Sequence, residues 1–247
     1  MGKLNLKEYI SLGGTSLANQ MQITKQEWQK TLRGYQEDHN KTPGVLREIE
    51  AIQTIITDPE ILKAYTINRV QIFIDERIRI INDSSLADNL DKKPASELIS
   101  KLTSDYDCSG IDFSKCETQD DVRKALYEEA GIEYISPQEV KKAYNNVNQL
   151  VESNSNVTEA MQTYEDLSHK AHCSVDNTGH LILVDRYLSP SDMVPYYQSG
   201  RGMASLINTN QKDLSAMLNE SGNTNQKDLS AMLNESGNTN PNTKYHR

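Results

Sequence analysis

The stretch from Asp58 to Ile81, DPEILKAYTINRVQIFIDERIRII, decides the fold class of this chain. Its second half reads as two short alternating runs around Asp-Glu, which is typical of a β-hairpin. However, Asp-Glu lacks the positive-φ residues of tight hairpin turns, and apolar residues recur every three or four positions, as on one helical face. We therefore expect a helix, with a hairpin as the alternative. The apolar face would consist of Ile67, Val70, Ile74, Ile78 and Ile81.

Helix start signals are frequent outside this stretch. Proline follows a capping residue at positions 43, 59 and 137, where its missing N–H costs nothing. Capping boxes, in which a hydroxyl and a carboxylate bind each other's backbone N–H groups, are expected at Thr24 with Glu27 and at Ser136 with Glu139. The sequence therefore predicts a mainly α-helical fold. The expected helices cover residues 24 to 37, 43 to 57, 59 to 81, 119 to 130 and 137 to 153, and weaker periodicity adds 5 to 12, 95 to 103, 158 to 171 and 191 to 206.

One segment favours strands, and another favours a hinge. A polar turn, Asp176 to Gly179, separates two short runs, so we expect a β-hairpin near residues 173 to 187. The polar stretch 83 to 96 is typical of a linker. The predicted body is bundle-like, with an N-terminal helical part over residues 1 to 82 and a second part over residues 97 to 207 that includes the hairpin.

A tandem repeat occupies the C-terminal residues 208 to 247. Asn208 to Gly222 recurs unchanged as Asn223 to Gly237, which indicates a duplication that packing has not reshaped. We expect a disordered tail, because helices as short as one repeat are marginal alone in water. Alternatively, the apolar residues at i, i+3 and i+4 of each copy dock in a groove of a partner protein. The partner-binding residues would then be Leu214, Met217, Leu218, Leu229, Met232 and Leu233.

Charge and cysteine content exclude several classes of protein. A net charge of -9 over 247 residues repels phosphate backbones, so binding to nucleic acid is not expected. No stretch approaches the roughly 20 apolar residues of a membrane span. Three cysteines cannot all pair with one another, and the N-terminus lacks the apolar core of a secretory signal. We therefore expect a cytoplasmic, reducing environment.

A calcium site is one hypothesis for the acidic stretch near residue 105. Asp105, Asp107 and Ser109, followed by Gly110, match the first six positions of a calcium-binding loop. The match breaks at position 8, where Asp112 replaces an apolar residue, and at position 12, where Cys116 replaces the bidentate glutamate. The alternative is an acidic turn, because aspartate and serine side chains bind their own backbone in turns.

A zinc site is a second hypothesis, because His169, His172, Cys173 and His180 lie within 12 residues. The alternative is structural: two of the histidines stabilise the negative end of a helix, and Cys173 is a small apolar residue. No cofactor is expected, and zinc or calcium are the alternatives.

Cys173, His180 and Asp185 offer the residue types of nucleophilic catalysis, namely a thiol, a base and an orienting carboxylate. Neighbouring strand positions face opposite sides, which weighs against their convergence. We therefore expect a non-enzymatic helical protein that binds another protein. The alternatives are a cysteine-dependent hydrolase or transferase that uses these three residues, or a small metal-binding helical protein.

The chain also resembles a class of exported proteins. An asparagine-rich, acidic, helical body without a signal peptide, followed by a polar tail with Glu235 and with Tyr245 third from the end, is similar to the effector proteins of bacterial type IV secretion. This resemblance implies transfer into a host cell without a cleaved signal peptide, and a host protein as the target. It implies no catalytic residue.

Overall fold

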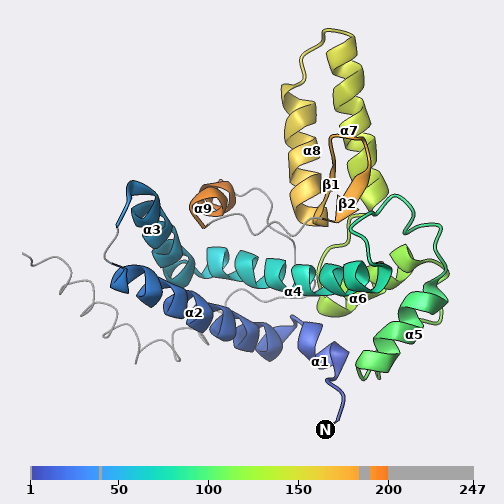
Figure 1. The fold of residues 1–247 in the computed structure, drawn as a ribbon, viewed down its shortest axis with the longest axis horizontal. Coiled ribbons are helices and arrows are strands. Elements are labelled where there is room, and N and C mark those ends of the chain that lie inside the picture. Colours follow the sequence, from blue (N-terminus) through green and yellow to red (C-terminus); the bar gives the residue numbers. More distant parts are fainter. Residues whose placement is uncertain (1, 39–40, 184–189, 200–247) are drawn as a thin grey trace, which may run out of the picture. The chain divides into compact units, whose positions relative to one another are not determined.

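The stretch from Asp58 to Ile81, for which a helix was expected and a β-hairpin was the alternative, forms one helix, α4 (Pro59–Asn82) (Figure 1). It begins where Asp58 accepts hydrogen bonds from the backbone N–H groups of Glu60 and Ile61 and where Pro59 occupies the first turn. Twelve of its 24 residues are buried. A helix buried on much of its circumference carries apolar residues on several faces, and this is why its sequence also resembled two strands.

The structure, a computed structural model, describes residues 2–38, 41–183 and 190–199. Within these residues the fold is mainly α-helical with one two-stranded antiparallel sheet, which confirms the predicted fold class of the body. No helix in this part of the chain has both the length and the apolar character to cross a bilayer. The repeat tail, with the six predicted partner-binding residues, lies outside the described residues, as does Asp185.

The N-terminal elements are α1 (Leu6–Ile10), α2 (Gly14–Glu37) and α3 (Pro43–Thr57), and both α2 and α3 pack against α4. The predicted start of a helix at Thr24 is wrong, because α2 begins ten residues earlier. Thr24 is buried inside α2, where its hydroxyl donates a hydrogen bond to the carbonyl oxygen of Gln20 over 2.9 Å. A Thr-x-x-Glu pattern therefore does not mark a helix start when no breaking residue precedes it.

The next helices are α5 (Ala95–Asp105), α6 (Gln119–Ala130), α7 (Pro137–Glu152) and α8 (Thr158–Ala171). The capping box of Ser136 with Glu139 is confirmed at the start of α7. A second box, of Thr118 with Asp121, starts α6. The last described helix, α9 (Pro190–Gln198), covers the first part of the helix expected over residues 191 to 206, whose remainder lies outside the described residues.

The predicted hairpin is confirmed as β1 (Cys173–Val175) and β2 (Leu181–Leu183), with Cys173 opposite Leu183 and Val175 opposite Leu181. The stretch expected to be a linker contacts this hairpin: the N–H of Ala87 donates to the carbonyl oxygen of Leu181 over 2.8 Å. α4 also packs against α5 and α6, so helices from both predicted helical parts are in contact.

Candidate functional site

Helices α7 and α8 form a helical hairpin that extends away from α2 and α4 (Figure 1). α7 packs mainly against α8 and β1. Val140 and Val147 of α7 are buried, and the rings of Tyr144 in α7 and Tyr164 in α8 meet with their centroids 5.5 Å apart. At the base, the Gln71 side-chain amide of α4 donates to the carbonyl oxygen of Lys170 over 2.9 Å. The hairpin is therefore anchored at one end.

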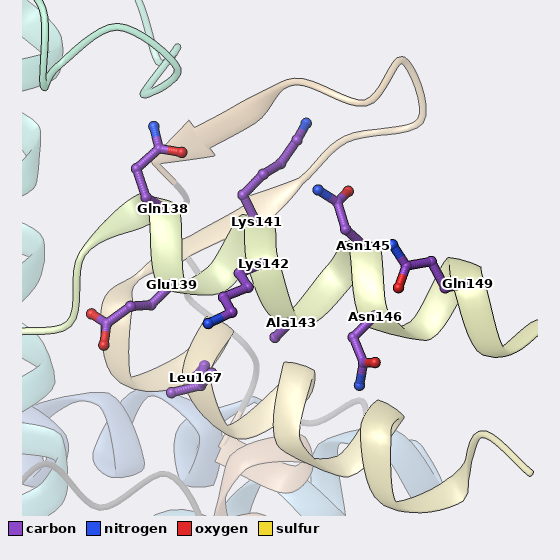
Figure 2. Close-up of a pocket in the computed structure, with 9 residues that line it drawn as sticks. All are labelled: Gln138, Glu139, Lys141, Lys142, Ala143, Asn145, Asn146, Gln149 and Leu167. Carbon is purple, nitrogen blue, oxygen red and sulfur yellow. The ribbon is translucent and has the colours of Figure 1, made fainter.

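An open hollow of about 740 Å³ runs along the length of α7 and is lined by residues of α7 and by Leu167 of α8 (Figure 2). Its lining is rich in amides and ammonium groups, and the carbonyl oxygen of Gly179 accepts a hydrogen bond from the Lys141 ammonium. Six of the lining residues are exposed, and one of them, Glu139, is bound to Ser136 in the capping box of α7. We call the other five, Gln138, Lys142, Asn145, Asn146 and Gln149, the α7 face. The whole lining consists of Gln138, Glu139, Lys141, Lys142, Ala143, Asn145, Asn146, Gln149 and Leu167.

The lining of this hollow suits binding better than catalysis. The side-chain amides both donate and accept hydrogen bonds, and an ammonium group donates only. The nine lining residues include no cysteine, serine or histidine, and their one carboxylate, Glu139, accepts hydrogen bonds from the N–H and the hydroxyl of Ser136. Such a surface can bind carboxylates and peptide groups of another molecule.

The outer end of the hairpin exposes apolar side chains. Val151, at the end of α7, is 56% exposed, and Met161, in the first turns of α8, is 38% exposed. Neighbouring positions in the connecting loop are polar and exposed. We call these two residues the hairpin tip. Two exposed apolar residues rimmed by polar ones have the composition of a small protein-binding surface.

The predicted catalytic residues do not converge in the described part of the chain. Cys173 is fully buried, and burial raises the pKa of its thiol to about 12, so the thiol is protonated at neutral pH. His180 precedes β2, and its Nδ1 lies 2.9 Å from a carboxylate oxygen of Asp88. Cys173 pairs with Leu183 across the hairpin, and His180 lies three residues before Leu183 in the chain. Cys173 and His180 are therefore roughly 10 Å apart along the strand direction.

The predicted zinc ligands are also dispersed. The His169 ring stacks on Tyr196 with centroids 4.3 Å apart, whereas His172 ends α8 in a left-handed conformation with φ of 48°. Nowhere in residues 2–38, 41–183 or 190–199 do three or more His, Cys, Asp or Glu side chains gather closely enough to hold a metal ion. The four residues are close in sequence, but the hairpin register separates Cys173 from His180.

The predicted calcium ligands hold the N-terminal segment instead. The Asp107 carboxylate accepts hydrogen bonds from the N–H of Ser109 over 2.9 Å and from the side-chain amide of Asn5 over 3.3 Å. The Ser109 N–H bond is the main reason why the pKa of Asp107 lies below its ordinary value. The backbones of Leu4 and Leu6 bond to Asp107 over 2.9 and 2.8 Å. Asp105 is the last residue of α5, outside this contact.

A buried polar cluster, none of whose residues is among the predicted site residues, joins α4 to α6. The Arg123 guanidinium donates to both carboxylate oxygens of Asp75, over 2.8 and 3.2 Å. The Tyr127 hydroxyl donates to the same carboxylate over 2.9 Å, and Arg123 also donates to the carbonyl oxygen of Ala171 over 2.5 Å. We call Asp75, Arg123 and Tyr127 the central cluster.

The charges of the central cluster are mutually stabilised. Burial is the largest single influence and disfavours the charged guanidinium, but Asp75, Tyr127 and Tyr134 together outweigh it, and the pKa of Arg123 is raised well above its ordinary value. Burial raises the pKa of Asp75, and the guanidinium opposes that rise. A sequence signal was present: Arg123 and Tyr127 stand at i and i+4 of α6, and Asp75 directly follows Ile74 of the apolar stripe. The pairing itself required the structure.

No family model matches the chain, and neither a curated protein nor a solved structure matches it.

Proposed function

We propose that this protein is a non-enzymatic interaction protein that binds another protein through the α7 face and the hairpin tip. The observation that carries the proposal is that the α7–α8 hairpin is anchored at its base, while its outer end exposes Val151 and Met161. Protein-binding surfaces commonly combine a few apolar anchors with a polar rim.

The charge of the α7 face suggests the chemistry of the partner. The chain as a whole carries a net charge of -9, yet two adjacent lysines, Lys141 and Lys142, lie on α7. When two protein surfaces carry opposite electrostatic potentials, they associate faster and exclude partners of the same charge. We therefore propose a partner surface that presents carboxylates to Lys142 and peptide or amide groups to Asn145 and Gln149.

The enzyme alternative has less support. It needs a thiolate at Cys173 and a base beside it, whereas burial holds the pKa of this thiol at about 12 and the imidazole of His180 contacts Asp88. The metal alternative lacks a cluster of ligands among the described residues.

The proposal is tested by site-specific photocrosslinking in cells that produce the full chain. A photoreactive residue at Asn145 or Val151 should give one discrete adduct with another protein. The same residue at Lys30, an exposed position on α2, should not give that adduct. Lys142→Glu should weaken the adduct about tenfold, and Lys30→Glu, the same charge change elsewhere, should leave it intact. Equal adducts from all positions, or none from the hairpin, would refute the proposal.

We further propose that the partner is a host protein and that the chain works in a reducing cytoplasm after transfer by a type IV secretion system. The support is the resemblance of the tail with Glu235 and Tyr245, together with the three cysteines, which are free thiols. A fusion to a reporter enzyme that is active only in the host cytosol tests this. Removal of residues 208 to 247 should abolish the reporter signal, and an unchanged signal would contradict transfer through the tail.

A further inference from the structure

A second hollow, of about 570 Å³, lies where the N-terminal segment meets the end of α5 and the loop that follows it. Pockets that bind small molecules have volumes of roughly 300 to 1,000 Å³. The two hollows share no described residue. We call this one the Tyr106 hollow, and its lining includes Lys3, Tyr106, Asp107, Cys108, Ile111 and Phe113.

The apolar part of the lining consists of Tyr106, Ile111 and Phe113, each of which is only partly exposed. The Tyr106 ring meets Phe73 of α4 edge-on, with centroids 6.1 Å apart, and this contact fixes its position. The N–H of Ile111 donates to the carbonyl oxygen of Cys108 over 3.2 Å, which holds the loop in a turn. These side chains are therefore already in place to receive the apolar part of a small molecule.

Two opposite charges also line the hollow, and in the described part of the chain they bond to other groups rather than to each other. The Lys3 ammonium donates to the carbonyl oxygen of Thr103 over 2.7 Å. The Asp107 carboxylate accepts hydrogen bonds from the N–H of Ser109 over 2.9 Å and from the Asn5 side-chain amide over 3.3 Å. An ammonium group has three donors and a carboxylate has about four acceptor positions, so each group can bind a further partner.

These charges favour a ligand that carries both signs. A ligand with a single charge would be attracted by one of the two groups and repelled by the other. The hydrogen bonds from Ser109 hold the pKa of Asp107 below its ordinary value, so this carboxylate is ionised at neutral pH. Thr103, another lining residue, lies in the last turn of α5, where the helix dipole favours a cation. A zwitterion would meet two attractions.

We propose that the Tyr106 hollow binds a free α-amino acid with an apolar side chain. The carboxylate of the amino acid would bind the Lys3 ammonium, and its ammonium group would bind the Asp107 carboxylate. Its side chain would lie against Tyr106, Ile111 and Phe113. A peptide carries its two terminal charges at opposite ends, whereas a free amino acid carries both on one carbon atom. This site shares no residue with the α7 face or the hairpin tip, so the two proposals can fail independently.

The first experiment uses the full chain and follows the thiol of Cys108. Cys108 and Cys116 are both partly exposed free thiols, and burial raises the pKa of both. Cys108 lines the hollow and Cys116 does not, so Cys116 is the internal control. L-Phenylalanine at millimolar concentration should slow the alkylation of Cys108 by N-ethylmaleimide at pH 7 at least fivefold, as measured by peptide mass spectrometry. A smaller effect, or equal slowing at Cys116, would refute the site.

Three further ligands separate the charges from the apolar side chain. 3-Phenylpropionate lacks the ammonium group, and phenethylamine lacks the carboxylate. Each should bind at least tenfold more weakly than L-phenylalanine in calorimetry at pH 7, because it loses one charge-assisted hydrogen bond and keeps one repulsion. Glycine, which has both charges and no apolar side chain, should not protect Cys108. An analogue that bound as tightly as L-phenylalanine would overturn the preference for a zwitterion.

Variants of the chain test which residue binds which charge. Lys3→Gln should weaken the binding of L-phenylalanine about tenfold without weakening that of phenethylamine. Lys115→Gln, the same change at an exposed position outside the lining, should bind like the wild type. Because Asp107 also holds the N-terminal segment, Asp107→Asn is judged by a ratio of affinities, which does not depend on the fraction of folded chain. Its preference for L-phenylalanine over 3-phenylpropionate should disappear, and a preference equal to that of the wild type would refute the role of Asp107.

Discussion

The central cluster and the α7 face both gather polar side chains on helices, and their environments are opposite. Arg123 is 0% exposed and Asp75 is 2% exposed, and each is satisfied by the other. On the α7 face, Lys142, Asn145 and Gln149 are exposed. The comparison teaches that polarity on a helix does not by itself identify a binding surface. Buried polar groups fix how helices pack, whereas exposed ones on an anchored hairpin remain available to a partner.

The largest expected effect is the loss of Arg123. Arg123→Met should destabilise the fold by about 3 to 5 kcal/mol, because the Asp75 carboxylate would stay buried without its counter-charge. Urea unfolding followed by circular dichroism measures the change. The double variant Asp75→Leu/Arg123→Met should recover most of the loss, because no charge is then buried. A single variant as stable as the wild type would show that the cluster does not fix the packing.

The next effect concerns the loop that holds the N-terminal segment. Gly110 has a φ of +88°, and a Cβ atom there would lie 2.9 Å from Cδ of Lys7. Gly110→Ala should therefore cost about 1 to 3 kcal/mol. Gly179→Ala is the matched control, because its φ is also +88° but its added Cβ has no neighbour within 4 Å. Equal losses in thermal unfolding would mean that Lys7 does not pack there.

A smaller and pH-dependent effect is expected at the start of α6. The Asp121 carboxylate accepts a hydrogen bond from the Thr118 N–H, and this bond keeps the pKa of Asp121 below its ordinary value. Asp121→Asn should cost about 1 kcal/mol or less at pH 7, because the group is partly exposed and solvent screens its charge.

The sign of this pH dependence follows from the lowered pKa. The stabilisation by Asp121 is fully present above the unfolded-state pKa of about 3.9 and is lost as the pH falls through the lower folded-state value. Unfolding of wild type and Asp121→Asn should therefore converge in acid. A gap that persisted at pH 2 would contradict a role for the ionised carboxylate.

The smallest effect on stability is expected at the hairpin tip. Val151→Ser and Met161→Gln should each change the free energy of unfolding by less than about 0.5 kcal/mol, because both side chains are substantially exposed. The same variants should weaken the photocrosslinked adduct. Unfolding curves that shifted by more than 1 kcal/mol would place these side chains in the packing of the hairpin, and the contrast with the central cluster would disappear.

The comparison also explains which sequence predictions were confirmed. The helix starts at Thr42, Asp58 and Ser136 were predictable because a capping side chain and a following proline act within one turn of the chain. The start at Thr24 was wrong because the same residue pair also fits inside a longer helix, and no local signal distinguishes the two. The hairpin from Cys173 was predicted from its turn, but its register was not.

The candidate sites were less predictable, because side chains close in sequence need not converge in space. His180 contacts Asp88, which is 92 positions away, and Asp107 contacts Asn5, which is 102 positions away. The catalytic, zinc and calcium hypotheses all grouped residues by sequence distance. The α7 face was not singled out, since asparagine, glutamine and lysine on a helix are ordinary solvent-facing residues until the packing of the hairpin is known.

The sequence by itself determined most of the helices, the caps at Thr42, Asp58 and Ser136, and the turn of the β-hairpin, because these depend on interactions within a few residues. Only the tertiary structure decided the role of the polar side chains. Asp75, the residue that most suggested a turn in the stretch from Asp58 to Ile81, lies in the centre of a helix because Arg123 on α6 neutralises it. Its burial depends on a partner 48 positions away, and local sequence does not encode such pairs.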